Sequence, residues 1–547
     1  MEKKTKIKFN IIIVIAIILF AIATIPKTFQ EDTYYLIKVG EYISQNGINV
    51  INERIEPFSW HEGIIYTYPH WLFDIILFFI YSIFDFSGIY ALTVILGIII
   101  YLLIYYTNIK VSKNNIISAI IAIASIYFFS DFITARAQII SYICFILEIL
   151  FIEGFLEKGK KRYIIGLILV PILLANCHAA LFPIYFVIYL PYIAEYIISF
   201  FNKEKWYEIR IKRISKKVEK LKLKQNSKNV QKLELKEKKL IKLKDKLKIA
   251  NKAKNTKVSK IIIERNKNIK WLILTFIICI FTGLLTPLKD IPYTYMIKSI
   301  QGNTMNFITE HQPVVLIHSI NLLIVFAIIL ICIFSNKVKI KLRDIFMLIG
   351  MSILSLIAYK QFPIFFICTM CIINKMINML VSDDIKEKVK SIVQKILSIK
   401  GMIYCILIII VMFLVQYKNI VGQNYVDSNE YPTLAATWLK NNVDVENMRL
   451  FNDFNYGSYL LFKDIPVFID GRADAYDPVF NGKDDDVFLD YMQASSLQVW
   501  YDDVLKKYDI THIITKTNSN FNTYLQRNIE YKNIYSDGTF SIYEVRK

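Results

Sequence analysis

The sequence is poor in charge for its length. Only 20% of its 547 residues are charged, 55% are hydrophobic, and the mean hydropathy is +0.40. Because an average soluble domain has about 25% charged residues, this composition excludes an ordinary soluble enzyme and predicts a polytopic membrane protein. No small-residue cleavage pattern follows the first apolar run, 9–25, so we expect that run to remain as a membrane span.

Cysteine is also missing from the places where a disulfide framework would need it. The seven cysteines are Cys144, Cys177, Cys279, Cys332, Cys368, Cys371 and Cys405. All lie in or at the ends of apolar runs, and none lies in the polar tail after residue 417. This placement argues against disulfides and against a cysteine-based metal site.

Almost all of the net charge belongs to one segment. Residues 201–270 hold 26 Lys/Arg and 7 Asp/Glu, a net of +19 in a chain of net charge +20. Leucine and isoleucine recur there every three or four residues among lysines, which predicts an amphipathic helix or helical hairpin. We expect a cytoplasmic insert next to anionic membrane lipid. The alternative for this insert is binding of RNA or of a specific partner. Since we favour the lipid interpretation, we expect no nucleic acid as a partner of the chain.

Apolar runs of suitable length predict eleven membrane spans. They are 9–26, 88–107, 115–130, 137–155, 162–177, 181–200, 271–287, 315–334, 344–359, 362–381 and 401–417. A twelfth apolar run, 71–84, has only 14 residues and contains Asp74, so we expect a helix at the outer interface with Trp71 and Tyr81 at headgroup depth. The prediction is a polytopic α-helical membrane protein with a separate polar tail.

Lysine and arginine in the short loops predict the orientation. Basic residues gather in alternate connections: 3–8, 110–113, 158–162, 201–270, 337–343 and 386–400. The connections between them carry few, namely Lys27, Lys38, Arg54, Arg136, Lys289, Lys298 and Lys360. The N-terminus is therefore predicted to be cytoplasmic and the tail extracytoplasmic, in a multi-pass protein of the cell membrane.

Four segments follow from these patterns. They are an N-terminal transmembrane module, 1–200, with a long outer loop at 27–87; the Lys-rich insert, 201–270; a second transmembrane module, 271–417; and an extracytoplasmic α/β domain, 418–547. In the tail, PTLAATWLKNN predicts a helix, and RLFND, PVFID, THIIT and FSIYEV predict short strands bounded by turn residues.

The predicted topology places most of the unusual polar residues on the outer side. They are Glu31, Asp32, Glu56, His61, Glu62, His70 and Asp74 in the first loop, Asp131 and Arg136 in the second, Asn176 and His178 in the third, Glu310 and His311 in the fourth, and Lys360 and Gln361 at the start of the tenth span. Ionisable groups at membrane depth are costly, so the set as a whole predicts a site. Carboxylates, imidazoles, cations and aromatic rings together suit a glycosyl phosphate.

Three motifs carry a resemblance to a known superfamily. They are DTYYLIKVGEYISQNG…EPFSWHEG…YPHWLFD in the first loop, ANCHAA in the third, and FNDFNYGSYL…PVFIDGRADAY in the tail. With the many spans and the outer α/β domain, they resemble the GT-C membrane glycosyltransferases, and in particular an uncharacterised bacterial branch. Members of the superfamily use sugar donors linked to polyprenyl phosphate. The Trp-Trp-Asp motif of oligosaccharyltransferases is missing, so transfer of a whole oligosaccharide to asparagine is not expected.

The resemblance implies roles for particular residues. Asp32, with Glu31 beside it, matches the first-loop acid that serves as catalytic base or as a metal-linked carboxylate, so a divalent ion at Asp32 is one option. Asp131 matches the second-loop acid by its place in the topology alone. The remaining candidates would bind substrate: His61, Glu62, His70, Trp71, Arg136, Asn176, His178, Glu310 and Lys360. Arg136 or Lys360 would hold the lipid phosphate.

Three functions stay open at this point. The first is transfer of one sugar from a polyprenyl-phosphate donor to an extracytoplasmic acceptor of the cell envelope. The second is transport or flipping of a lipid-linked saccharide, which would favour polar residues at mid-membrane and internal repeats. The third is a non-catalytic assembly protein that uses its tail as a binding module. The sugar, the acceptor and the need for a metal are left open by the sequence.

Overall fold

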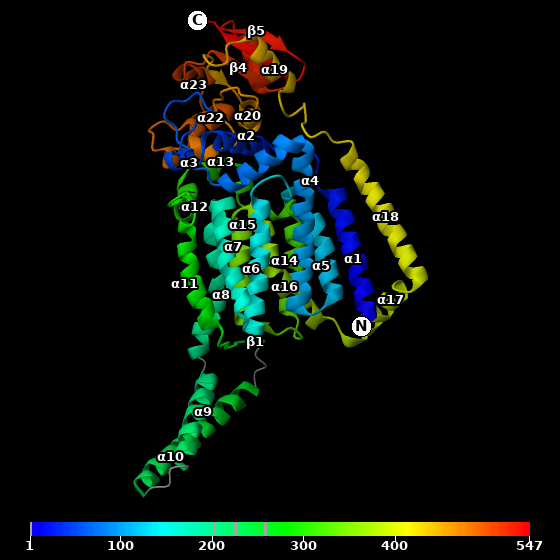
Figure 1. Cartoon of the computed structure of the whole chain (residues 1–547), viewed down its shortest axis with the longest axis vertical. Coiled ribbons are helices and arrows are strands. Elements are labelled where there is room, and N and C mark those ends of the chain that lie inside the picture. Colours follow the sequence, from blue (N-terminus) through cyan, green and yellow to red (C-terminus); the bar gives the residue numbers. More distant parts are fainter. Residues whose placement is uncertain (1–2, 202, 223–226, 256–259, 547) are drawn as a thin grey trace.

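The computed structural model describes residues 3–201, 203–222, 227–255 and 260–546, and 72% of it is helical. Figure 1 shows a long bundle of helices with a region of mixed helix and strand on one end, which holds the C-terminus. The N-terminus lies at the opposite end of the bundle, and a pair of helices projects beyond that end.

Six helices of the described residues are long and apolar enough to cross a membrane. They are Lys4–Thr24 in α1 (Lys3–Thr24), α4 (Trp71–Ser112), α6 (Gln138–Lys158), Ala179–Phe201 with α8 (Phe182–Phe201), Tyr359–Leu380 with α16 (Phe362–Leu380), and α18 (Ile399–Val421). The chain is therefore a largely helical protein with the long apolar helices of a membrane protein.

The other five predicted spans fall on shorter helices. They are α5 (Asn115–Phe128), α7 (Lys161–Cys177), α11 (Ile269–Ile280) with η3 (Phe281–Leu284), α14 (Ile320–Phe334) and α15 (Leu342–Ile357). A helix of 14 residues extends about 21 Å, less than the hydrocarbon thickness of about 30 Å. The count of eleven spans thus stays a prediction.

The first outer loop consists of short helices that lie across the end of the bundle. They are α2 (Glu31–Asn46) and α3 (Asn49–Glu53), followed by the first part of α4. Asp85 interrupts α4 with φ 54° and ψ −158°, so residues 71–84 cross the end of the bundle and the rest of α4 descends along it (Figure 1). Gly40 of α2 touches this first part so closely that a Cβ would lie 2.0 Å from the carbonyl oxygen of Asp74.

The C-terminal region is built on a four-stranded sheet of order β3-β4-β6-β5. Its strands are β3 (Leu450–Phe451), β4 (His512–Lys516), β5 (Tyr531–Ser536) and β6 (Phe540–Val545), with β3 parallel to β4 and the other pairs antiparallel. Its helices are α19 (Thr433–Asn442), α20 (Phe454–Phe462), η7 (Ala473–Tyr476), α21 (Pro478–Asn481), α22 (Val487–Ser495), α23 (Tyr501–Lys507) and α24 (Asn520–Arg527).

The segment PVFID is not one of these strands, contrary to the expectation from its sequence. Val467 instead forms an isolated bridge with Ser59 of the first loop, and its N–H donates to the carbonyl of Phe58 at 3.3 Å. Trp60 likewise donates its indole N–H to the carbonyl of Leu450 at 3.0 Å. The first outer loop and the tail, far apart in sequence, are therefore interleaved in one structure.

The Lys-rich insert forms α9 (Lys203–Lys222) and α10 (Ser227–Asn255), a hairpin that points away from the bundle (Figure 1). Its return strand, β1 (Ile261–Ile262), pairs with β2 (Ile340–Lys341). Glu264, just after β1, accepts from Lys341 at 2.5 Å. The segment from 260 onward is thus part of the base of the bundle, and the hairpin alone protrudes.

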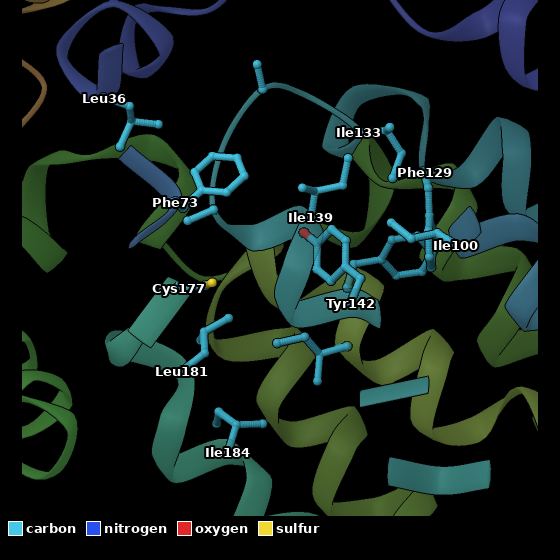
Figure 2. Close-up of a cluster of buried hydrophobic side chains, with 14 of the residues drawn as sticks. Leu36, Phe73, Ile100, Phe129, Ile133, Ile139, Tyr142, Cys177, Leu181 and Ile184 are labelled. Atoms are coloured by element: carbon cyan, nitrogen blue, oxygen red, sulfur yellow. The ribbon is translucent and has the colours of Figure 1, made fainter. Parts of the chain in front are cut away.

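The remaining helices lie at the outer end of the bundle, except α17, which lies near the N-terminus and precedes α18 (Figure 1). They are η1 (Ser130–Phe132), η2 (Ala179–Leu181), α12 (Ile291–Gln301), α13 (Thr304–Phe307), η4 (Thr309–His311), η5 (Leu316–His318), η6 (Tyr359–Gln361) and α17 (Asp383–Ile396). Figure 2 shows the apolar cluster under this end, where Leu36 of α2 and Phe73 of α4 lie above Tyr142, Leu181 and Ile184.

Candidate functional site

A large cavity lies where the bundle meets the C-terminal region. Its volume is about 840 Å³, within the usual range of small-molecule sites. The bundle and its outer loops contribute Glu31, Asp32, Tyr35, Tyr66, His70, Arg136, His178, Tyr295, Glu310, His311, Lys360 and Gln361, and the C-terminal region contributes Asp453, Phe454, Asn455, Gly471, Asp474, Tyr491 and Ser495. Most of the predicted outer-face residues that were expected to converge do line this one space.

Asp32 and Arg136 form the central ion pair of the cavity. Asp32 lies in the first turn of α2, Arg136 precedes α6, and Nη2 of Arg136 lies 2.5 Å from Oδ2 of Asp32. Nη1 of the same guanidinium approaches Glu310 at 3.4 Å and the amide oxygen of Gln30 at 3.4 Å. Burial raises the pKa of Asp32, and the Arg136 guanidinium opposes part of that rise. Asp32 is thus a carboxyl whose pKa is raised toward the range of a general base.

Glu31 is held by the C-terminal region. Its Oε1 accepts a hydrogen bond from Oγ of Ser458 at 2.9 Å, and that Oγ accepts from the backbone N–H of Gly471 at 3.1 Å. Burial and the neighbouring charge of Asp32 raise the pKa of Glu31 well above its usual value. A Cβ on Gly471 would lie 3.0 Å from Oδ1 of Asp32, so the backbone of Gly471 lies close to Asp32 and leaves little room for a side chain there.

A second cation, Lys360, lies on η6 between α15 and α16. Its ammonium group donates to Nε2 of His311 on η4. Burial and the charges of Lys360 and Arg136 lower the pKa of His311 to about 3. His311 is therefore neutral at physiological pH and accepts the hydrogen bond from Lys360. The same space thus holds two basic side chains, Lys360 and Arg136.

Two further histidines face each other in the cavity wall. The ring centroids of His70, which precedes α4, and His178, which follows α7, are 5.0 Å apart. Nδ1 of His178 shares a hydrogen bond of 2.7 Å with Oγ of Ser141. Burial lowers the pKa of His70 to about 3 and that of His178 well below its usual value. Both rings are neutral hydrogen-bonding groups rather than charges.

Asp131 lies in a smaller neighbouring cavity. That cavity has a volume of about 170 Å³ and shares Arg136, Glu310 and Lys360 with the larger one. Asp131 is thus separated from Asp32 by the cations that both cavities share, and its catalytic role stays a prediction.

Four predicted site residues do not line either cavity. Nε2 of His61 contacts the carbonyl of Phe468 at 2.9 Å within the C-terminal region. Glu62 is exposed, and its carbonyl accepts from Lys483. Asn176 donates to the carbonyls of Ile172 and Leu285 at 2.8 and 3.0 Å, and Trp71 packs against the core. The four residues therefore lie outside both cavities, and their role in substrate binding stays a prediction.

The structure adds residues that the sequence had not singled out. Asp474 lines the cavity from η7 and accepts from Oγ1 of Thr67 at 3.2 Å. It follows Arg472, which is fully buried and binds Glu56 and Asp470, each at 2.7 Å. The sequence signal that could have pointed to Asp474 and Arg472 was the run of charges in FIDGRADAY, inside an otherwise apolar stretch. It did not tell which carboxylate points into a cavity and which is buried in an ion-pair network.

The donor set does not fit a resident metal ion. In the described parts of the chain, no three His, Cys, Asp or Glu side chains are grouped so that they could hold one. Asp32 pairs with Arg136, and Lys360 binds His311.

Comparison with protein-family models and with curated protein sequences gives no match to this chain.

Proposed function

We propose that the protein is a membrane glycosyltransferase of the GT-C type, which transfers a sugar from a polyprenyl-phosphate donor to an acceptor of the cell envelope. In this proposal the chain crosses the cell membrane eleven times, with a cytoplasmic N-terminus and an extracytoplasmic C-terminal domain. The positions of the two termini at opposite ends of the bundle fit an odd number of crossings (Figure 1). The Lys-rich hairpin lies at the N-terminal end, as a cytoplasmic insert would.

One observation carries the proposal: a half-buried acid and two cations share a cavity that also has an apolar flank. The charged groups are Asp32, Arg136 and Lys360. The apolar flank consists of Leu181, Met296, Ile300, Phe307, Leu354, Ile357 and Ile364. A lipid phosphate needs cations for its head group and apolar surface for its chain, and the acid beside them provides a proton acceptor.

The reaction assigned to this site is a direct displacement. Asp32 takes the proton of an acceptor hydroxyl, and the hydroxyl oxygen forms a bond to the anomeric carbon of the donor sugar. The bond between that carbon and the phosphate oxygen breaks, and its electron pair stays on the phosphate. Arg136 and Lys360 stabilise the charge that develops on the leaving polyprenyl phosphate. Attack opposite the leaving group inverts the anomeric configuration, and no metal-dependent step is needed.

Replacing the proposed base tests this function. The protein, purified in lipid nanodiscs, is supplied with a radiolabelled hexose on undecaprenyl phosphate, and released or transferred sugar is counted. Asp32→Asn keeps the size of the side chain but removes its basicity, so turnover should fall by about 10²–10⁴-fold. Glu41→Gln is the matched control, because Glu41 lies on the same helix and pairs with Lys38 outside the cavity.

The result also separates the alternative functions. A transporter would move the labelled lipid between leaflets without cleaving it, and an assembly protein would neither cleave nor move it. Normal turnover by the Asp32→Asn variant would remove Asp32 from the role of base. Failure of the unmutated protein to consume any polyprenyl-phosphate sugar would contradict the enzyme proposal itself.

A further inference from the structure

The charges of the cavity are unevenly divided between its two sides. The described residues of the C-terminal region contribute two carboxylates to the lining, Asp453 and Asp474, and no Lys or Arg. Both cations of the lining, Arg136 and Lys360, come from the outer ends of the bundle. A molecule that fills the cavity would therefore meet both cations at the bundle, beside the carboxylates of Asp32 and Glu310, whereas the charged groups that it meets at the C-terminal region are carboxylates alone.

Asp474 is fixed in position by a network below it. Two residues earlier, Arg472 binds both Glu56 and Asp470, and the hydroxyl of Tyr476 donates to Asp470 at 2.5 Å. All of these groups are buried, so η7 cannot easily turn Asp474 away from the cavity. Burial raises the pKa of Asp474 to about 6 even though Thr67 donates to it, so the carboxyl is mostly ionised at pH 7.

Asp453 is the second carboxylate on this side and caps α20. Its Oδ1 accepts from the backbone N–H and from the side-chain amide of Asn455, at 2.8 and 2.9 Å. Asn455 and Ser495 line the cavity beside it. The aromatic rings of Phe454 and Tyr491 lie on the same wall and offer flat surfaces of the kind that a sugar ring can cover.

Gln361 provides independent evidence about the ligand. It is 8% exposed, it lines the cavity, and its Oε1 has no hydrogen-bond partner among the residues that the structure describes. A buried oxygen left without a donor is costly, and a small rotation of the Gln361 amide toward the cavity would let a bound molecule donate to it. An amide oxygen cannot bind the oxygens of an ionised phosphate, but it can accept from a hydroxyl or an amine.

We infer that the acceptor is a neutral or amine-bearing sugar, without carboxylate or phosphate near the reacting hydroxyl, and that it binds against Asp453 and Asp474. This inference rests on the proposed transferase function. The donor phosphate takes the two cations, so the acceptor meets carboxylates and the unpaired oxygen of Gln361. Hydroxyl and ammonium groups can donate to all three, whereas an anionic acceptor would place like charges together in a confined space, which disfavours binding.

A set of three octyl glycosides tests the inference by binding, without requiring turnover. Octyl glucoside, octyl glucosaminide and octyl glucuronide differ in charge and share one ring size and one alkyl chain. Calorimetric titration into the protein in nanodiscs should give similar or tighter binding for the glucosaminide than for the glucoside. The glucuronide should bind at least about tenfold more weakly, as expected for like charges brought together.

Two variants connect this preference to the C-terminal region. Asp474→Asn should reduce the discrimination against the glucuronide by several fold. Asp485→Asn is the control, because Asp485 pairs with Lys507 at 3.0 Å and does not line the cavity. A thermal melt of each variant reports whether it folds, and Asp453→Asn provides a second test if Asp474→Asn unfolds.

Each outcome has a distinct meaning. Equal or tighter binding of the glucuronide by the unmutated protein would overturn the inference. Unchanged discrimination in folded Asp474→Asn and Asp453→Asn variants would overturn the assignment to these carboxylates. If the charge preference is observed but no polyprenyl-phosphate sugar is consumed, the proposed transferase function fails while the sugar-binding preference remains.

Discussion

Adding one methyl group at Gly471 would test how closely the C-terminal region controls the acid pair. A Cβ at this position would lie 3.0 Å from Oδ1 of Asp32, 3.0 Å from Oγ of Ser458 and 3.4 Å from Oε1 of Glu31. Ordinary contacts of this kind begin near 3.4 Å, so the first two groups must move by a few tenths of an ångström. The methyl group would press on Oδ1 of the proposed base, whereas Arg136 contacts Oδ2.

Two magnitudes decide what such a shift does. Overpacking of this kind costs about 1–3 kcal/mol of stability, which a folded domain of ordinary stability survives. Displacement of a reacting group by up to about 1 Å costs as much as 10²-fold in rate. We therefore expect Gly471→Ala to lower sugar transfer by roughly 10–100-fold, with a melting temperature only a few degrees lower.

The assay is donor turnover in nanodiscs together with a thermal melt. Gly350→Ala is the control, since a Cβ at Gly350 of α15 would meet nothing within 4 Å and alanine is the better helix former. Full activity of a folded Gly471→Ala variant would refute the reasoning, because it would mean that the acid pair tolerates displacement or takes no part in the reaction.

Three other predictions follow from the same contacts. Arg136→Gln removes the charge that opposes the rise in the pKa of Asp32, so the acidic limb of the turnover profile should move to higher pH; an unmoved limb would separate Asp32 from the pH dependence. Deletion of 205–257 should leave folding and donor turnover intact. A longer deletion that also removes β1, the strand that pairs with β2, should lower the melting temperature of the bundle. With an impermeant thiol reagent on intact cells, a cysteine replacing the exposed Asn518 should be labelled and one replacing the exposed Lys242 should not; the reverse pattern would invert the proposed orientation.

The helical part of the fold was predictable because apolar run length is a local property. Each of the eleven predicted spans falls on a helix, and the break between 71–84 and 88–107 coincides with the non-helical Asp85. The strand PVFID was misjudged because its backbone partners come from the first loop, a contact of long sequence separation. The strand β5 was missed because its outward residues are polar and give no alternating apolar pattern.

The site was predictable at the level of which loops converge, and less so at the level of single side chains. Positive-inside counting placed Asp32, Arg136 and Lys360 on one side, and the cavity contains all three. His61 lies in the same loop as Asp32 and is also polar, but it turns into the C-terminal region and contacts the carbonyl of Phe468. Sequence does not tell which of two polar residues faces a cavity when both have partners hundreds of residues away.

The interleaving of the first loop with the tail has a consequence for biosynthesis. Glu56 and Arg472 are about 400 residues apart in the chain, yet they form a fully buried ion pair. At a synthesis rate of about 5–20 residues per second, the loop waits roughly 20–80 s before its partner is made. During that time the carboxylate of Glu56 is without its guanidinium and the edge at Ser59 is without Val467. The cavity is therefore among the last parts of the molecule to form, and a chain cut short in its tail would insert its helices and still lack a site.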